Sequence, residues 1–265
     1  MLPTFLAAAF GRLRDRRGFV SEVGGGGWTP GYHLDQSRWI TAHLPISRYA
    51  ARELPGRRKA HEVIYGGVDP ERYSMRAEPS HDGSVVFLGR ILPHKGIHHL
   101  IEAVGPETPL HVVGTALDEA YLDRLRKAAA GKRVTFHHGL PDTEVIALLH
   151  RAMALVHPTP VDADGSAGVN ELLGLAPIEG MACGCPVVAS AVGPLPEVVA
   201  HEETGLLVAP NDPQAIRAAL DRLRSDPDLW RALSRAARER VLARFTWDRI
   251  ARHCLDLYTR APGEW

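Results

Sequence analysis

The sequence has few cysteines, no excess of charge and no long apolar run. Its 265 residues include only three cysteines, which are too few and too unevenly spaced for a disulfide framework. Lys plus Arg and Asp plus Glu both number 31, so the formal net charge is zero, and this argues against a nucleic-acid-binding protein. No apolar run reaches the roughly 18 residues that a membrane span needs. These features favour a protein of the reducing cytoplasm.

Two stretches that look like functional signals have simpler interpretations. The C-x-C of Cys183 and Cys185 has no second Cys or Cys/His pair at metal-ligand spacing, so packing of small side chains is favoured over a zinc site. The opening MLPTFLAAAFGRLRDRR has no charge before its apolar part, which makes it a poor signal peptide. We interpret it as a helix packed on its own protein, with a helix on a membrane surface as the alternative.

Strands alternate with helices over most of the chain. The apolar run SVVFL predicts a buried parallel strand, and the following GIHHLIEAV carries Ile97, Leu100 and Ile101 at helical spacing. Further strands are predicted in PLHVVG, RVTFHHG, ALVHPT, PVVAS and GLLVAP. Helices are predicted in DEAYLDRLRKAAAG, with Gly131 as its stop, in DTEVIALLHRA and between ALVHPT and PVVAS, and three more helices end the chain. This alternation predicts an α/β fold with a parallel sheet, in which ligands bind beyond the carboxyl ends of the strands.

The first 75 residues predict a smaller unit. GFVSEVGGGG, WITAHLPIS and HEVIYGGVDPERY each predict a strand, and RYAAREL predicts a helix. These pieces are too few to close a sheet alone, and RAEPSHDG has the Pro and Gly of a linker. We therefore expect a partial N-terminal domain at 1–75, a complete domain at 76–245, and a C-terminal helix at 246–265 that packs back toward the N-terminal part.

Two cations follow the first strand of the larger domain. The stretch GRILPHKG puts Arg90 and Lys95 at the carboxyl edge of the sheet, between glycines that permit a sharp turn. Two cations that face a helix N-terminus can bind a phosphate group. Solvated surface side chains are the alternative that this stretch leaves open.

A polar loop with two carboxylates follows the strand ALVHPT. Pro177 favours the first turn of a helix that contains Glu179, whereas Glu171 lies in the preceding loop. Backbone N–H groups near Gly174 and Leu175 then point outward with the positive end of the helix dipole. This arrangement would bring acceptors for sugar hydroxyls and donors for a diphosphate together.

Other ligand chemistries fit this loop less well. Asp162 and Asp164 form a D-x-D that could hold a metal ion with a diphosphate. A calcium loop requires Gly and Glu at positions that here hold Ala167 and Leu173. A carboxylate pair for glycoside hydrolysis would leave the cations of GRILPHKG unexplained. No G-x-S-x-G, P-loop or G-x-G-x-x-G motif occurs in the sequence.

Several motifs in order resemble one enzyme family. GRILPHKG, the E-x7-E of Glu171 and Glu179, EGMACGCPVVASAVGPLPEVV and TGLLVAPNDP closely resemble the retaining family 4 glycosyltransferases, whose GT-B fold has two facing Rossmann-like domains. The resemblance runs from residue 84 to about 212 and continues through the C-terminal helices, and YGGVDPERY is similar to the family's interdomain turn. Leu173 and Gly180 depart from the family's usual aromatic and alanine without removing a polar contact.

The resemblance implies roles for the charged candidate residues. Arg90 and Lys95 would bind the diphosphate of a nucleotide sugar and stabilise it as it leaves. Glu171 would accept hydrogen bonds from hydroxyls of the donor sugar, and Glu179 from the ribose hydroxyls. With the two cations, Glu171 would make up the catalytic set.

Three glycines and a leucine complete the implied donor site. Backbone N–H groups near Gly174 and Leu175 would contact the sugar and the phosphate. The base would lie near the strand ends at Gly114 and Gly139. The family usually requires no metal, so no metal or other cofactor is expected here.

The resemblance covers only part of a two-domain enzyme, because the first 75 residues resemble only the late part of the acceptor domain. The implied function is transfer of a sugar from a nucleotide-diphosphate sugar to an unknown glycan, lipid or small-molecule acceptor, with retention of anomeric configuration. The alternative is a non-catalytic donor-binding half that needs a partner subunit or associates with itself. No nucleic-acid partner is expected, and the expected location is cytoplasmic, with attachment to a membrane surface as the alternative.

Overall fold

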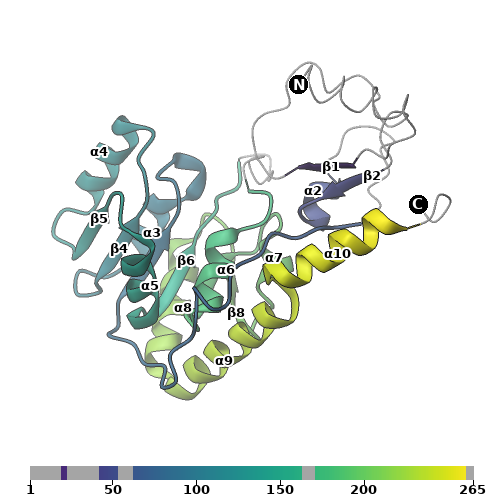
Figure 1. The fold of residues 1–265 in the computed structure, drawn as a ribbon. Helices are drawn as coiled ribbons and strands as arrows, with labels where there is room; N and C mark the ends of the chain where they lie inside the picture. Colours follow the sequence, from purple (N-terminus) through teal and green to yellow (C-terminus); the bar gives the residue numbers. More distant parts are fainter. Residues whose placement is uncertain (1–18, 23–41, 53–61, 163–170, 261–265) are drawn as a thin grey trace.

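Two parallel β-sheets organise the chain (Figure 1). The computed structural model describes residues 19–22, 42–52, 62–162 and 171–260. The smaller sheet pairs β1 (Phe19–Glu22) with β2 (Ala42–Pro45). The larger sheet has six strands, and every pair of neighbours in it is parallel. The predicted α/β class with a parallel sheet is therefore confirmed.

The strand order of the larger sheet reverses at its centre, between β3 (Val85–Leu88) and β6 (Ala154–His157). Its other strands are β4 (Leu110–Val113), β5 (Val134–His137), β7 (Val187–Ser190) and β8 (Gly205–Val208). In space they follow the order β5-β4-β3-β6-β7-β8. The first strand of this sheet, β3, is central. Strands β4 and β5 follow on one side of it, and β6, β7 and β8 follow on the other side, beginning with β6 next to β3. Such a reversal opens a crevice at the carboxyl ends of the two central strands, where parallel α/β sheets bind ligands.

Helices connect the strands and follow the last of them. They are α2 (Arg48–Arg52), the 3-10 helix η3 (Pro93–Lys95), α3 (Ile97–Ala103), α4 (Glu119–Ala128), α5 (Asp142–Arg151), α6 (Leu175–Ala182), α7 (Leu195–Val198), α8 (Pro213–Ser225), α9 (Pro227–Arg244) and α10 (Trp247–Thr259). Side chains of Asp118, Asp212 and Asp226 accept backbone N–H groups at the starts of α4, α8 and α9. An aspartate in this position satisfies donors that the helix itself leaves open.

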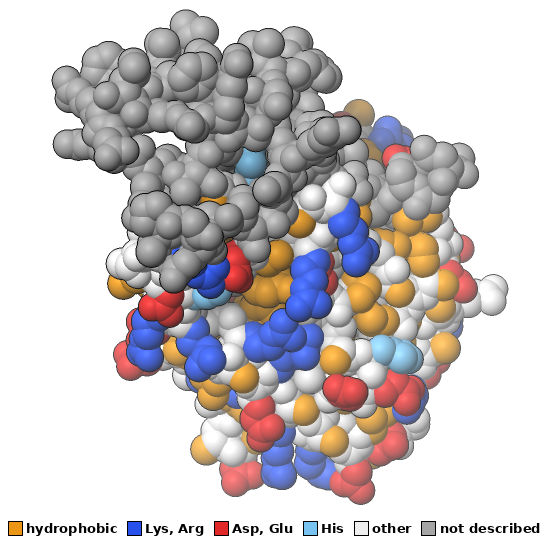
Figure 2. Space-filling view, turned by 90° about the vertical axis from the view of Figure 1, so that its right-hand side faces the viewer, with side chains coloured by type: hydrophobic (Ala, Val, Ile, Leu, Met, Phe, Trp, Pro, Cys, Tyr) orange, Lys and Arg blue, Asp and Glu red, His pale blue; other side chains and the backbone are white. Residues whose placement is uncertain are grey.

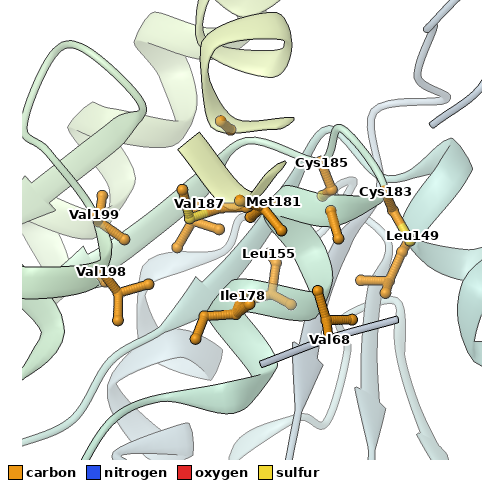
Figure 3. Close-up of a cluster of buried hydrophobic side chains, with 14 of the residues drawn as sticks. Val68, Leu149, Leu155, Ile178, Met181, Cys183, Cys185, Val187, Val198 and Val199 are labelled. Atoms are coloured by element: carbon orange, nitrogen blue, oxygen red, sulfur yellow. The ribbon is translucent and has the colours of Figure 1, made fainter. Parts of the chain in front are cut away.

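Each face of the larger sheet has its own core. Val85 and Phe87 belong to one buried cluster and Val86 to the other, because successive side chains of a strand point to opposite faces. On the second face, Ile178 of α6 and Leu155 of β6 lie in one cluster (Figure 3). Cys183 and Cys185 belong to the same cluster and are free thiols, which confirms the packing role predicted for them.

Helix α10 carries the chain back to the smaller sheet. In Figure 1 it runs from the end of α9 toward β1 and β2. Ile250 and Leu257 of this helix share a buried cluster with Ala42, Leu44 and Ile64. The division of the chain at residues 75 and 245 stays a prediction.

The carboxylate of Glu197 also connects α2, which follows the smaller sheet, to α7 of the larger domain. Glu197 of α7 accepts hydrogen bonds from the backbone N–H groups of Arg48 (2.9 Å) and Tyr49 (2.7 Å) at the start of α2. The hydroxyl of Tyr65 donates to the same carboxylate at 3.0 Å. A negative charge at a helix N-terminus is favourable, so this contact fixes α2 against the larger sheet.

Two local predictions differ from the structure. No strand is assigned within residues 62–67, and Val68 makes only an isolated bridge with Thr246, so the strand predicted in HEVIYGGVDPERY is wrong. Helix α4 ends at Ala128, earlier than its expected end at Gly131. Helix α7 was not predicted. The opening helix, the glycines of EVGGGG and Asp164 lie outside the described residues.

The described residues on the face at the right of Figure 1 carry side chains of several kinds. Figure 2 shows basic and acidic side chains mixed over this face, with smaller hydrophobic areas between them. This mixture fits the net charge of zero. Within the described ranges, no helix combines the length and the apolar character needed to cross a membrane.

Candidate functional site

A buried ion pair lies at the point where the sheet reverses. The Nζ atom of Lys95, just after β3, is 2.6 Å from Oε2 of Glu171, which lies between β6 and α6. The same oxygen accepts a hydrogen bond from Nε2 of His157, the last residue of β6, at 2.8 Å. The Lys95 and Glu171 side chains are only 9% and 12% exposed, so this contact is not a surface pair. The sequence predicted that Lys95 and Glu171 belong to one site, and the structure brings them into contact.

A close backbone approach holds the lysine beside β6. Gly96 follows Lys95 with a left-handed φ of 67°. A Cβ atom on Gly96 would lie 1.9 Å from the carbonyl oxygen of Pro158, so only glycine fits here. The turn after β3 therefore lies against the end of β6, and Lys95, the residue before Gly96, contacts Glu171 there.

The electrostatic balance keeps Glu171 ionised. Burial by itself would raise the pKa of this carboxyl, but the hydrogen bond and charge of His157 and the nearby charge of Lys95 outweigh burial and hold the pKa at about 2. A buried carboxylate needs such partners, because an unpaired charge in the interior is strongly unfavourable. At neutral pH Glu171 thus presents acceptor oxygens only.

Arg90 lies at the same edge of the sheet but is not part of this contact. It is exposed, and it makes no hydrogen bond or ion pair with another described residue. Between the two cations in sequence, His94 has a lowered pKa because of its burial and the charges of Lys95 and Arg90. The arginine is therefore available to an incoming anion.

The two glycines predicted to border the base follow β4 and β5. Gly114 has a φ of 154°, and a Cβ atom there would lie 1.8 Å from the carbonyl oxygen of Gly89. Gly139 has a φ of 65° with no atom within 4 Å of an added Cβ. Gly114 thus keeps the loops after β3 and β4 close together, and Gly139 lies in open space.

Helix α6 begins at the site without a side-chain cap. Gly174 precedes it with a left-handed φ of 96°, and no side chain of the N-cap residue bonds the first turn. Leu175, the first helical residue, is exposed. The first backbone N–H groups of α6 and the positive end of its dipole therefore lie next to Gly174, three residues after Glu171 in the sequence.

Glu179 lies on α6 and is bound by a tyrosine. The hydroxyl of Tyr73 donates to its Oε1 atom at 3.3 Å. Burial raises the pKa of Glu179, while the hydrogen bond from Tyr73 and the charge of Arg72 oppose this increase. Burial and the charge of Glu179 in turn raise the pKa of Tyr73 to about 12. The two glutamates do not share a partner, so each has its own hydrogen-bonding environment.

Sequence reasoning missed His157 and Tyr73. His157 is a polar residue that ends an otherwise apolar strand at the ligand-binding edge, and this was a usable signal. Tyr73 lies in a turn far from Glu179 in sequence, and nothing in its neighbourhood indicates the contact. Among the described residues no group of three or more His, Cys, Asp or Glu side chains could hold a metal ion.

This arrangement can bind an anion beside a polar, neutral group. Arg90, Lys95 and the start of α6 supply positive charge, and Glu171 and Glu179 supply hydrogen-bond acceptors. Hydroxyl groups donate to such acceptors, and phosphates bind to such cations. A ligand that carries both kinds of group fits the site.

Comparison with known proteins gives a family and a set of relatives. The model of the family Glycosyl transferases group 1 matches residues 74–240. A glycogen synthase of Mycobacterium tuberculosis is 32% identical over 208 residues, which are 75% of this chain and 48% of that protein. A GDP-mannose-dependent alpha-(1-6)-phosphatidylinositol monomannoside mannosyltransferase of Mycolicibacterium smegmatis is 35% identical over 187 residues, 67% of this chain and 47% of the relative. The chain spans about half the length of these curated relatives.

Solved structures share the fold over nearly the whole chain. Anabaena Alr3699/HepE, in complex with UDP and glucose, has a TM-score of 0.77 and 21% identity, with 96% of this chain and 74% of that chain covered. Sucrose-phosphate synthase from Thermosynechococcus elongatus has a TM-score of 0.75 and 26% identity, with 96% and 71% covered. The predicted GT-B architecture is confirmed by these neighbours.

Proposed function

Because the chain belongs to the glycosyl transferases group 1 family, we propose that it binds a nucleotide-diphosphate sugar and takes part in transferring the sugar to an acceptor with retention of configuration. The observation that carries this proposal is the buried contact between Lys95, Glu171 and His157 beside the start of α6. It places fixed acceptors next to positive charge at the edge where parallel sheets bind ligands.

The diphosphate would bind to the cations and the helix. Arg90 is exposed, and Lys95 has a flexible stem, so both side chains can reach a ligand beyond the strand ends. The backbone N–H groups near Gly174 and Leu175 add the positive end of the α6 dipole. On binding, Lys95 would exchange its contact with Glu171 for one with a phosphate oxygen. The ion pair thus keeps both side chains in place before the donor arrives.

The carboxylates would bind the sugar and the ribose. Oε1 of Glu171 has no hydrogen-bond partner among the described residues, so it can accept from a hydroxyl of the donor sugar. Glu179 would accept from the ribose hydroxyls, with Tyr73 fixing its other side. The base would then lie toward Gly114 and Gly139 at the ends of β4 and β5.

The same groups would stabilise the transition state. As the bond between sugar and diphosphate breaks, negative charge grows on the leaving phosphate, next to Arg90, Lys95 and the helix start. Fixed charges and dipoles at such a position contribute about 3 kcal/mol for each donor. We propose no side-chain base, because the leaving phosphate can itself take the proton of the acceptor hydroxyl. No metal or other cofactor takes part in this proposal.

Calorimetric titration of the chain with UDP, GDP and ADP tests donor binding. We expect one of the three to bind, and Arg90→Ala to weaken that binding by about 10- to 100-fold through loss of a charge-assisted hydrogen bond. Arg90 is a better residue to replace than Lys95, because it is exposed and its removal leaves the buried ion pair between Lys95 and Glu171 intact.

Arg231→Ala is the matched control. Arg231 is another exposed arginine, near the start of α9, and it pairs with Asp228 there. We expect its removal to leave the affinity unchanged. If a folded chain binds none of the three nucleotides, or if both variants weaken binding equally, the proposed donor site is wrong.

A further inference from the structure

His157 contacts the proposed sugar-binding carboxylate but plays no part in the proposed chemistry. We propose that His157 is a positioning residue, which holds Glu171 in place for the donor sugar while Lys95 turns to the diphosphate. This inference rests on the proposed function. It follows from the two hydrogen bonds to Oε2 of Glu171 and from the different freedom of their donors.

The proton on His157 is fixed by its partner. A carboxylate can only accept, so Nε2 of His157 carries the hydrogen of the 2.8 Å contact. Its other nitrogen, Nδ1, is buried and has no hydrogen-bond partner in the part of the chain that the structure describes. Among the described residues, the hydrogen bond to Glu171 is therefore the only one that the imidazole nitrogens of His157 make.

Lys95 and His157 respond differently to a diphosphate. The lysine is a point charge on a flexible stem, so a phosphate attracts it away from Glu171. The imidazole of His157 is buried on a short side chain at the end of β6, so it cannot follow the phosphate in this way. Once Lys95 has moved, His157 is the remaining donor to the carboxylate among the described residues.

The ring itself has little room to move. His157 is 3% exposed, and its ring lies parallel to that of Phe87, with centroids 6.4 Å apart and planes at 7°. It ends β6, where it pairs with Ala189 of β7. The next residue, Pro158, packs against Gly96. A donor held in this way fixes Oε2 and leaves Oε1 to accept from a sugar hydroxyl.

Two variants separate this role from simple packing. His157→Leu keeps a similar volume without a donor, and His157→Gln keeps an N–H that can reach the carboxylate. Calorimetry measures their affinities for a nucleoside diphosphate and for the matching sugar donor. The probes are UDP with UDP-glucose, GDP with GDP-mannose, and ADP with ADP-glucose, and the pair used is the one that the unchanged chain binds.

The ratio of the two affinities is the decisive quantity, because the nucleoside diphosphate alone does not use Glu171. We expect His157→Leu to lower the preference for the sugar donor by about tenfold, the effect of one hydrogen bond to a charged group, and His157→Gln to restore most of it. The affinity for the nucleoside diphosphate should change less than threefold.

Three results would overturn the inference. An unchanged ratio in His157→Leu would show that Glu171 keeps its place without the histidine. Equal weakening of both ligands in both variants would assign a packing role only. If the unchanged chain binds the sugar donor no more tightly than the nucleoside diphosphate, the sugar contributes nothing to binding. Glu171 then makes no sugar contact that His157 could position. If the unchanged chain binds no nucleoside diphosphate, the proposed function itself is wrong, and the inference is wrong with it.

Discussion

Replacing Lys95 tests the buried ion pair as a source of stability. Lys95→Met keeps the apolar stem but leaves Glu171 as a nearly buried carboxylate with His157 as its remaining donor. Removing one partner of a buried pair costs about 3–5 kcal/mol, because the other charge stays behind without compensation. We expect about 3 kcal/mol here, the lower end of this range, since the histidine continues to donate.

A double-mutant cycle isolates the contact from the two side chains. Glu171→Gln removes the opposite charge, and the double variant Lys95→Met with Glu171→Gln leaves no uncompensated charge behind. We therefore expect the double variant to be more stable than the sum of the single losses predicts, with a coupling of about 2 kcal/mol or more. Urea unfolding at pH 7 measures the four free energies of unfolding, those of the unchanged chain and of the three variants, with the buried Trp230 as a fluorescence reporter.

An exposed pair of the same kind sets the scale. Arg231 and Asp228 form a contact of 2.8 Å at i,i+3 spacing on α9, with side chains 54% and 95% exposed. Pairs of this type contribute about 0.2–0.5 kcal/mol. If the coupling between Lys95 and Glu171 does not exceed that of this exposed pair, the argument from burial is refuted.

Three further measurements test the same region. The pKa of Glu171 lies at about 2, below its ordinary value of 4.5, so its contribution of about 3 kcal/mol is complete above pH 4.5 and is lost as the pH falls toward 2. The unfolding free energy of Glu171→Gln should lack this part of the pH dependence. Gly96→Ala should destabilise the chain by about 1–3 kcal/mol more than Gly131→Ala. Both glycines have a positive φ, but only Gly96 has an atom within 4 Å of an added Cβ. Equal losses of unfolding free energy in urea would contradict the close approach at Gly96. Tyr73→Phe removes the donor to Glu179, so the pKa of this carboxyl should rise further, and a carboxyl carbon titration by NMR that shows no rise would refute the contact.

The regular elements of the larger sheet were predictable because local pattern and packing agree there. The apolar runs that end at 88, 113 and 157 are too short for helices, and each became a buried strand. The strand predicted in HEVIYGGVDPERY does not form, and its backbone makes only an isolated bridge at Val68. An added Cβ on Gly67 would lie 2.7 Å from Ile250, so this segment packs closely against α10 and makes no ladder.

The two charged residues of the buried ion pair could be assigned to one site from the sequence, but their contact could not be predicted. Residues after parallel strands meet at one edge, so Lys95 and Glu171 could be assigned to one site from their places in the pattern. Their direct ion pair could not, because it depends on how closely the turn at Gly96 approaches β6. The role of His157 was hidden for a similar reason, since a histidine inside a strand pattern does not indicate which way its ring points.

The strand order, rather than any local motif, brings the site together. Lys95 and Glu171 are 76 residues apart, and they meet because the chain returns from β5 to place β6 beside β3. In a sheet with the sequential order β3-β4-β5-β6, these strands would be three positions apart, about 14 Å at the usual spacing between strands. The ion pair could not form at that separation, and His157 would donate to a carboxylate without a cation beside it. The contact between Lys95 and Glu171 therefore depends on the reversal at β3 and β6, and changes that preserve this reversal should preserve the proposed donor site.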